Sequence, residues 1–263
     1  MQKKVETQFT GEMQDELFSL EDHSWWFQYR AKLLAEVAEL FFCKDCLTYD
    51  VGGGNGFTTR YLEKLGYNMA LLEPTEEACI NGRKRGLKKV VCGTIDDLNE
   101  SVDQITLLDV LEHIEDDEAF LNNLYRHLSE EGRLLIAVPA FNVLWSSEDD
   151  AAGHFRRYRL RELRRKVESA GFDVLLTSYF YQFLFLPILL VRVMLEKIGI
   201  VKRYDMRDEE ERRKINQQQF EERGYLVTKV LDLLTSREIS KIKNGFGLSF
   251  GSSIVLVAKK KGL

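Results

Sequence analysis

A short glycine-rich stretch, residues 47–57 (LTYDVGGGNGF), is the part of this sequence best suited to hold a ligand. The apolar residues stop at Gly52, and glycine recurs at Gly54 and Gly56 before a helix-like pattern begins at Thr58. Glycine tolerates positive φ and lets the backbone approach a ligand closely. The free N–H groups of the helix that follows point at whatever lies above the turn. The pattern therefore predicts a strand, a tight turn that cradles a ligand, and a helix.

The spacing of these glycines favours one class of ligand. A dinucleotide fingerprint, G-x-G-x-x-G, would need a third glycine at the position of Phe57. A phosphate-binding P-loop would need G-K-[ST], and no Lys or Arg occurs between Leu47 and Thr59. Asp50 instead precedes the turn, and Glu73 ends the next apolar run, where an acid binds the hydroxyls of a ribose. These two acids favour a cationic ligand with amine and hydroxyl groups over a pyrophosphate.

The turn DVGGGNG at residues 50–56, Glu73 behind it and the segment from Asp109 to Pro139 resemble the core of class I S-adenosylmethionine-dependent methyltransferases. The similarity is to a bacterial subgroup with type 11/23-like methyltransferase domains, and it covers residues 47–172, roughly half of the chain. It implies S-adenosylmethionine as the cofactor and S-adenosylhomocysteine as the product. It also implies a doubly wound, Rossmann-like α/β fold with a seven-stranded sheet whose last strand is antiparallel.

The resemblance also implies which residues hold the cofactor. Arg30 reaches its carboxylate, and Asp109 lines the floor beneath it. The family often has an acid in the adenine loop where this chain has Thr94, so the adenine partner stays open among Thr94, Ile95 and Asp96. The full set is Tyr29, Arg30, Asp50, Gly52, Gly53, Gly54, Asn55, Gly56, Glu73, Pro74, Thr94, Ile95, Asp96, Asp109 and Val110.

Two histidines and a tyrosine are the candidates for catalysis. By the resemblance, His113 lies near the transferred methyl group, although packing of the next helix would explain it equally well. The stretch after Pro139 contains W-S-x-x-D and G-H-x-R-R-Y patterns that the same subgroup has, so we expect the acceptor there. A hydroxyl acceptor needs a base with a pKa near neutrality, for which His113, His154 and Tyr158 are candidates. The alternative is that the arginines of this stretch pair with its aspartates and hold the loop in place.

Strand-like and helix-like patterns alternate from residue 47 onward, as a doubly wound parallel sheet requires. The predicted strands are residues 47–51, 68–72, 89–92, 104–110, 133–138, 172–179 and 252–258. The predicted helices are residues 12–42, 58–65, 74–86, 117–128, 160–170 and 225–234. A stretch of some twenty residues from position 140 has little regular pattern and is a functional or mobile loop. Residues 205–219 are charged and polar, which predicts a solvated helix or a tether.

The domain organisation follows from these patterns. We expect one methyltransferase domain over residues 1–263, made of an N-terminal helical lid (1–46), a cofactor-binding core (47–179), a helical insertion (180–250) and the last strand (251–260). The lead-in HSWWFQYR, residues 23–30, resembles helices that cover the pocket in the same subgroup and exclude water. The simpler alternative is that its tryptophans pack in the core.

Residues 179–199 (YFYQFLFLPILLVRVMLEKIG) form the most apolar stretch. A membrane span needs about twenty apolar residues, and Gln182, Pro187 and Arg192 interrupt this stretch. We therefore expect a buried helix that closes the acceptor pocket, or a dimer face. The alternatives are a wall for a lipophilic substrate, or peripheral membrane contact through residues 180–195.

Composition limits the classes of partner, cellular location and cysteine chemistry that fit this chain. The net charge of −5 argues mildly against nucleic acid as the main partner, because such proteins usually carry a basic face. The N-terminus lacks the apolar segment of a signal peptide. Cys43 and Cys46 form a C-x-x-C pair, but Cys79 and Cys92 are too scattered to complete a metal site or a disulfide framework. We expect reduced thiols, no metal, a cytoplasmic location and a small-molecule acceptor, with a homodimer as one option.

Three functions fit these observations. The first is S-adenosylmethionine-dependent methyl transfer to a small, lipophilic acceptor, and it is the one that we predict. The second is a non-catalytic scaffold that binds S-adenosylmethionine or a partner protein; intact Asp50, Gly54 and Glu73 argue against lost cofactor binding. The third is a nicotinamide-dependent oxidoreductase, which the absence of a third glycine at Phe57 disfavours.

Overall fold

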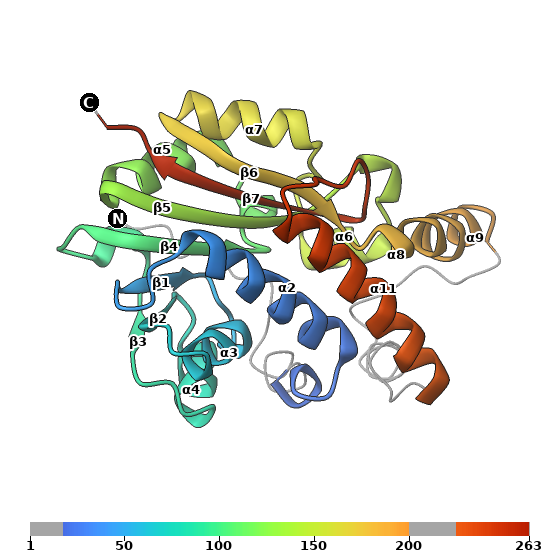
Figure 1. The fold of residues 1–263 in the computed structure, drawn as a ribbon, viewed down its shortest axis with the longest axis horizontal. Coiled ribbons are helices and arrows are strands. Elements are labelled where there is room, and N and C mark those ends of the chain that lie inside the picture. Colours follow the sequence, from blue (N-terminus) through green and yellow to red (C-terminus); the bar gives the residue numbers. More distant parts are fainter. Residues whose placement is uncertain (1–17, 200–224, 263) are drawn as a thin grey trace.

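The computed structural model describes residues 18–199 and 225–262, which contain a seven-stranded sheet (Figure 1). The strands are β1 (Thr48–Val51), β2 (Met69–Glu73), β3 (Val90–Cys92), β4 (Val102–Leu108), β5 (Leu128–Pro139), β6 (Phe172–Phe180) and β7 (Ser253–Lys260). Their order is β3-β2-β1-β4-β5-β7-β6; β7 is antiparallel to both neighbours, and the other pairs are parallel. The strand order reverses between β1 and β4, so their carboxyl ends flank the crevice where open α/β sheets bind ligands.

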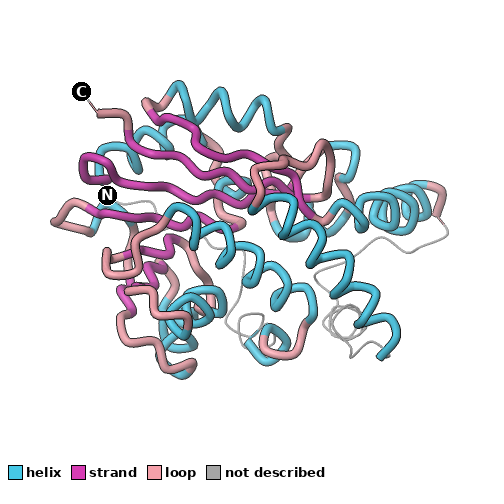
Figure 2. Tube along the Cα trace, viewed as in Figure 1, coloured by secondary structure: helices cyan, strands magenta, loops and turns pink. Residues whose placement is uncertain are grey.

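Helices cover both faces of the sheet (Figure 2). The helices are α2 (Trp25–Phe41), α3 (Phe57–Lys64), α4 (Glu76–Lys84), α5 (Asp117–His127), α6 (Ser147–Ala152), α7 (Leu160–Ser169), α8 (Gln182–Pro187), α9 (Leu195–Lys197) and α11 (Tyr225–Lys243). Shorter turns are η1 (Ile95–Asp97), η2 (Leu111–His113) and η3 (Asn142–Leu144), and η4 (Ile188–Met194) is a π-helix. α2 packs against α3 and α11, while α5 packs against α7. The predicted doubly wound fold with an antiparallel last strand is confirmed.

Continuous apolar strands build the core. All residues of β1 and β2 are buried, as expected for parallel strands that are covered on both faces. Ile136 of β5 and Val255 of β7 are fully buried at the centre of the sheet. β6 lies at one edge, and its exposed and half-exposed residues reflect that position.

The predicted elements differ from the structure in a few places. α2 begins at Trp25 rather than at residue 12, because residues 22–24 interrupt the helical pattern. β5 begins at Leu128 and passes through Gly132, where a break was expected, because Glu131 takes a positive φ and stays within the strand. α11 extends to Lys243 rather than to residue 234. Residues 12–17 and the segment 205–219 lie outside the described residues.

The stretch after residue 140 is more regular than expected. It contains η3 and α6, and Ser146 starts α6 through a capping box with Asp149. In this arrangement each side chain satisfies a backbone N–H of the other residue, which stabilises a short helix. The prediction of a patternless loop is therefore wrong for residues 142–152.

Arg85, at the end of α4, fastens the segment 18–22 to the glycine-rich turn. Its Nη2 and Nη1 atoms pair with Glu21 and Asp22, each at 2.6 Å, and its Nε donates to the backbone carbonyl of Asn55 at 3.0 Å. The guanidinium also lies 4.4 Å from the ring centroid of Phe18. Burial raises the pKa of Glu21 to about 7, against the opposing effect of Arg85.

A buried carboxylate joins the N-terminal helix to the C-terminal insertion. Glu238 of α11 accepts hydrogen bonds from the hydroxyl of Tyr29 (2.8 Å) and from the backbone N–H groups of Tyr181 (2.9 Å) and Gln182 (2.7 Å). It therefore satisfies the free N–H groups at the start of α8. The ring of Tyr181 stacks on Trp26 with centroids 4.1 Å apart. α2, α8 and α11 thus form one packed unit.

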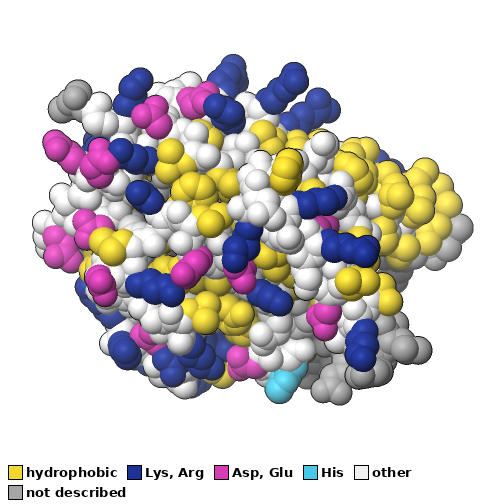
Figure 3. All heavy atoms as spheres, in the orientation of Figure 1, with side chains coloured by type: hydrophobic (Ala, Val, Ile, Leu, Met, Phe, Trp, Pro, Cys, Tyr) yellow, Lys and Arg dark blue, Asp and Glu magenta, His cyan; other side chains and the backbone are white. Residues whose placement is uncertain are grey.

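The apolar stretch 179–199 is only partly buried. In its helical part, which begins at Gln182, Ile188 and Val193 are the described residues that are buried, so the expectation of a buried helix holds for few positions. The other side forms what we call the apolar ridge, visible as the yellow projection at the right of Figure 3. The ridge consists of Leu186, Leu190, Val191, Met194 and Ile198, with exposed fractions of 60%, 52%, 54%, 50% and 66%. Among the described residues, no helix combines the length and the apolar character that crossing a membrane requires.

The cysteines divide into two pairs. Cys79 of α4 and Cys92 at the end of β3 are joined by a disulfide, with Cα atoms 6.0 Å apart. The expectation of reduced thiols is wrong for this pair, because α4 folds back beside β3 and brings together residues that are 13 positions apart. Cys43 and Cys46 are free, and a hydrogen bond from Cys46 lowers the pKa of Cys43.

Replacing Glu238 with Gln should lower the free energy of unfolding by about 2 kcal/mol, because an amide nitrogen cannot accept the hydrogen bonds of buried donors. Urea unfolding measures this change. Asp232→Asn, at an exposed position of the same helix, is the matched control and should change stability by less than about 0.5 kcal/mol. Equal losses in the two variants would contradict the role assigned to Glu238.

The Glu21 carboxyl should make stability depend on pH. Its pKa rises from the ordinary 4.5 to about 7 in the folded chain, so the folded state binds the proton more tightly. The resulting stabilisation is fully present below pH 4.5 and is lost as pH rises through 7, by about 3 kcal/mol. Urea unfolding between about pH 5 and about pH 8 should show this loss in the unmodified chain and a clearly smaller loss in Glu21→Gln, where the other buried acids still titrate. Asp22→Asn should keep the loss; an unaltered pH profile in Glu21→Gln would refute the assignment.

Candidate active site

The glycine-rich turn lies at the carboxyl end of β1, between the carboxyl ends of β2 and β4. Gly52 and Gly54 have φ values of +69° and +55°, which favour glycine. A Cβ on Gly52 would lie 2.8 Å from a methyl carbon of Val110, so close packing also requires glycine there. A Cβ on Gly54 would meet no atom within 4 Å. Gly54 therefore borders open space where the sequence predicts a ligand.

Glu73, the last residue of β2, lies beside this open space. Its Oε2 accepts a hydrogen bond from the N–H of Gly54 at 3.1 Å, and its Oε1 accepts one from the hydroxyl of Thr75 at 2.8 Å. Burial raises the pKa of Glu73, although both hydrogen bonds favour the charged form. The carboxylate is held in one orientation, where hydroxyl groups of a ligand above Gly54 could donate to it.

Asp50 has a different position from the one expected. It is 1% exposed, and its two carboxylate oxygens accept hydrogen bonds from the hydroxyls of Thr59 (2.6 Å) and Thr106 (2.7 Å). Burial raises its pKa, and these hydrogen bonds oppose the rise. The side chain therefore ties α3 and β4 together beneath the turn, and the structure does not support direct contact between this carboxylate and a ligand.

Arg30 of α2 and Asp109, directly after β4, form an ion pair with 2.6 Å between Nη1 and Oδ2. Asp109 has a φ of +54°, a strained value for a residue with a side chain, and strain of this kind gathers at functional sites. The Nε of Arg30 is buried and has no hydrogen-bond partner. Buried polar atoms in native proteins are nearly always paired, and a ligand carboxylate is a natural partner for a guanidinium.

Tyr29 and Asn55 have partners that explain them without a ligand. Tyr29 is buried in the aromatic unit of α2, stacks on Trp25 and donates its hydroxyl to Glu238. Asn55 is buried and accepts a hydrogen bond from the amide of Asn81 at 3.2 Å. These contacts favour structural roles over the predicted contact with a cofactor.

The predicted adenine loop is held by its own residues. Thr94 forms a capping box with Asp97, and Ile95 is buried in the core. Asp96 accepts a hydrogen bond from Asn123 of α5 at 2.7 Å. The structure does not single out one of Thr94, Ile95 and Asp96 as the adenine partner. The remaining predicted residues, Gly53, Gly56 and Pro74, lie in or directly beside the glycine-rich turn and the end of β2.

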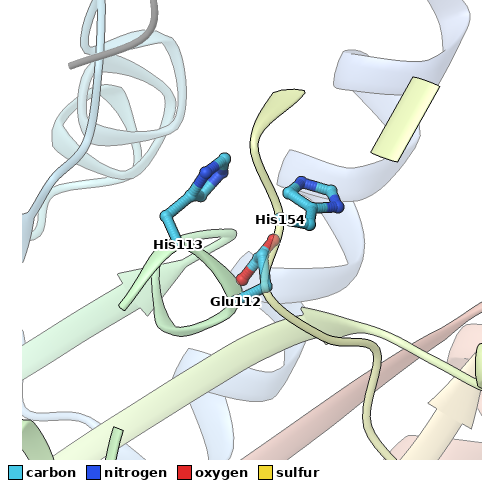
Figure 4. Close-up of side chains that lie close together, drawn as sticks. All are labelled: Glu112, His113 and His154. Atoms are coloured by element: carbon cyan, nitrogen blue, oxygen red, sulfur yellow. The ribbon is translucent and has the colours of Figure 1, made fainter. Parts of the chain in front are cut away.

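His113 and His154 come from distant parts of the chain and meet at this edge of the sheet (Figure 4). Their rings lie 4.7 Å apart, nearly perpendicular, with the carboxylate of Glu112 beside them. Burial lowers the pKa of His113 to about 4, and the nearby His154 adds to this effect. The N–H of Phe155 donates to the carbonyl of Glu112 at 2.8 Å, which ties the two loops together.

Asp149 holds the imidazole ring of His154 in one orientation. Its Oδ1 lies 2.8 Å from the Nδ1 of His154 and 2.7 Å from the Nε of Arg157, and its Oδ2 accepts from the N–H of Ser146 at 3.0 Å. Burial opposes ionisation, but the hydrogen bonds from His154 and Arg157 lower the pKa of Asp149. The pairing of Arg157 with Asp149 confirms the structural alternative considered for this stretch, while His154 stays at the site.

Tyr158 is unsuited to be a base. It is fully buried, and its hydroxyl contacts the carbonyl of Leu111 at 3.2 Å and donates to Asp117 at 2.8 Å. Burial and Asp117 raise its pKa above the ordinary range of tyrosine. The catalytic role predicted for Tyr158 is therefore wrong, because the residue fastens the loop that carries His154 to η2 and α5.

Two features of the site have only weak signals in the sequence. Glu112 could have been noticed because it sits beside His113 after an apolar strand, where parallel sheets place functional residues. The ion pair between Arg85 and Glu21, which holds the N-terminal segment, has no sequence signal, since 64 positions separate the two residues.

Solved structures share this fold at low sequence identity. The [4+2]-cyclase SpnF superposes with a TM-score of 0.59 and 17% identity, over 97% of this chain and 96% of its own. Phosphoethanolamine N-methyltransferase 2 of Haemonchus contortus, solved with S-adenosyl-L-methionine, gives 0.58 and 17%, over 98% of this chain and 59% of its own. A methyltransferase of Thermotoga maritima that depends on S-adenosylmethionine gives 0.53 and 20%, over 96% and 100%.

The sequence comparison carries the family assignment. No curated protein matches the chain. A family model described as a methyltransferase domain matches residues 26–177, which is more than half of the chain and includes the glycine-rich turn, Glu73, Asp109, His113 and His154. This match confirms the resemblance found in the sequence. The chain belongs to the methyltransferase domain family, whose cofactor is S-adenosylmethionine.

Proposed function

We propose that this chain transfers the methyl group of S-adenosylmethionine to a small, lipophilic acceptor. The observation that best supports the proposal is the open space bordered by Gly54, with the carboxylate of Glu73 beside it. Arg30 lies at the same edge of the sheet and keeps a buried Nε without a partner. A carboxylate and a guanidinium fit the ribose hydroxyls and the amino-acid carboxylate of the cofactor.

Each residue of this edge has a role in holding the cofactor. Glu73 accepts hydrogen bonds from the ribose, and Arg30 binds the carboxylate of the methionine part. Gly54 leaves room for the nucleoside, while Asp109 and Val110 form the floor. Asp50 acts indirectly, since its hydrogen bonds to Thr59 and Thr106 fix the turn from below.

The bound cofactor supplies a methyl group on a positively charged sulfur, ready for in-line displacement. The protein has to align two reactants and exclude water, which accounts for much of the rate of such a reaction. The aromatic unit of α2 and α8, with Trp26 stacked on Tyr181, is suited to close the site. This is the lid role that we propose for residues 1–46, together with the insertion at 180–250.

The acceptor lies beside His113 and His154, next to an aromatic wall. Phe141 follows β5, stacks on Tyr179 with centroids 4.8 Å apart and contacts Phe185 of α8 at 5.6 Å. Such an apolar wall, together with the two imidazoles, would fit an acceptor with an apolar body and one polar group. The apolar ridge on α8, η4 and α9 extends this character to the surface, so we place peripheral lipid contact there. A small molecule, rather than nucleic acid, remains the predicted acceptor.

Gly54→Ala should weaken S-adenosylmethionine binding by at least about tenfold, because the new methyl group enters the space assigned to the cofactor. Calorimetric titration measures this change. Gly245→Ala is the matched control, since Gly245 has a φ of +77° and equally open surroundings at the end of α11. Both variants should lose about 1 kcal/mol of stability through backbone strain. Unchanged affinity in Gly54→Ala would show that the cofactor site is misplaced.

His154→Ala should slow methyl transfer by at least about tenfold and leave the affinity for S-adenosylmethionine unchanged, because His154 faces the acceptor rather than the cofactor. Release of S-adenosylhomocysteine, measured with a panel of lipophilic alcohols, phenols and amines, reports the rate. His127→Ala, at the end of α5, should keep full activity. Full activity in His154→Ala would exclude the residue from the chemistry, and binding without turnover across the panel would favour the scaffold alternative.

A further inference from the structure

Three side chains that commonly bind metals converge beside the site. Glu112 and His113 lie in η2, which begins shortly after the end of β4, and His154 follows α6 (Figure 4). One ligand atom from each residue can be chosen so that all three lie within 4.8 Å of one another. The carboxylate of Glu112 points toward the two imidazole rings (Figure 4). The topology brings this set together, because Glu112 and His154 are 42 positions apart in the chain.

Glu112 indicates that the cluster takes a ligand. It is 1% exposed, and its Oε2 atom is buried without any hydrogen-bond partner. A buried polar atom that lacks a partner is costly and in native structures calls for an explanation, such as an ion. Arg30, the nearby cation of α2, forms its ion pair with Asp109 rather than with Glu112.

The imidazoles are oriented as those of metal ligands are. The Nδ1 of His154 lies 2.8 Å from the buried carboxylate of Asp149, which leaves its Nε2 on the side of the cluster. A ring nitrogen of His113 hydrogen-bonds to the carbonyl of Ala152. A histidine ligand usually binds the metal through one nitrogen and donates the other N–H to a carboxylate or a backbone carbonyl. Both arrangements occur here.

From this geometry we propose that Glu112, His113 and His154 bind a divalent transition-metal ion, with Zn²⁺ as the ion that matches them best. Two nitrogen ligands and one oxygen ligand suit Zn²⁺ and its neighbours, whereas Mg²⁺ and Ca²⁺ prefer oxygen alone. Bonds of roughly 2.0–2.2 Å in a tetrahedral site place the ligand atoms about 3.4 Å apart, so side-chain rotations must bring the three atoms closer by up to roughly 1.4 Å. Three protein ligands leave one coordination position open.

The open coordination position gives the metal ion a role in catalysis. This role rests on the proposed methyl transfer. The oxygen of a hydroxyl acceptor binds there, and the ion lowers its pKa so that its proton passes to solvent water. The oxygen then attacks the methyl carbon of the cofactor. The O–C bond forms as the C–S bond breaks, and the electron pair of that bond stays on sulfur. The site thus selects acceptors with a hydroxyl group over those with only an amine.

Metal binding is tested on the full chain without cofactor. Because Cys43 and Cys46 are free thiols in a C-x-x-C pair, the reference protein is the double variant Cys43→Ser/Cys46→Ser. Titration with Zn²⁺ against a chromophoric chelator should show one equivalent bound, and Co²⁺ should give a visible spectrum without a thiolate band. Glu112→Gln and His154→Ala, made in the same reference, should each weaken Zn²⁺ binding by about a hundredfold.

The control and the contrary outcomes are specific. His127→Ala should bind Zn²⁺ as the reference does, and circular dichroism should show that all variants keep the fold. Glu112→Gln nearly preserves the shape of the side chain, so it tests the site even if His154→Ala fails to fold. No stoichiometric binding in the reference, or equal binding in Glu112→Gln, would overturn the proposal.

The role in catalysis is tested separately. Removing the ion with a chelator should slow methylation of alcohols and phenols by at least about tenfold, and Zn²⁺ should restore it, with S-adenosylmethionine affinity unchanged. Unchanged rates after removal would overturn this role. Should the chain bind Zn²⁺ but not S-adenosylmethionine, the proposed function fails while the metal site stands.

Discussion

The charge balance around Arg30 is the constraint on which the site depends. This buried guanidinium pairs directly with Asp109 and lowers the pKa of Asp50, Glu21 and Glu112, each of which burial raises. Several buried acids at one edge of a sheet would repel one another without a cation among them. Because Arg30 belongs to α2, the N-terminal helix contributes the cation that lies among these acids. α2 is therefore part of the electrostatics of the site.

Backbone strain marks the same edge of the sheet. Three of the non-glycine residues with positive φ, Asp109, Phe141 and Tyr181, follow β4, β5 and β6 at their carboxyl ends. Such conformations persist only where the surroundings impose them, and they gather at functional sites. Here they turn the chain sharply, so that Asp109 meets Arg30 and Phe141 stacks on Tyr179. These sharp turns thus set the positions of side chains at the carboxyl ends of three strands.

Buried carboxylates join segments that lie far apart in the described chain. Glu238, near the C-terminus, binds Tyr29 of α2 and the start of α8. Arg85 binds Glu21 and places the N-terminal segment against the glycine-rich turn. These two buried carboxylates connect segments that the sheet alone would leave independent.

The sequence by itself determined the sheet and the position of the turn. Apolar runs with glycine between them are local signals, so β1, β2 and the turn at Gly54 could be predicted within a residue or two. Glu73 was also predictable, because it sits at a fixed distance beyond the turn. The prediction from hydrophobic patterns failed in the stretch after residue 140. It gave a loop there, whereas the capping box of Ser146 starts the short helix α6.

Only the tertiary structure decided which predicted residues face the site. Asp50, Tyr29 and Tyr158 have suitable chemistry, but each is fully occupied by partners far away in the sequence. Conversely, Glu112 meets His154 only because a loop crosses the carboxyl edge of the sheet. The physical reason is that hydrogen bonds and ion pairs depend on distance in space, and a pattern along the chain records only distance in sequence.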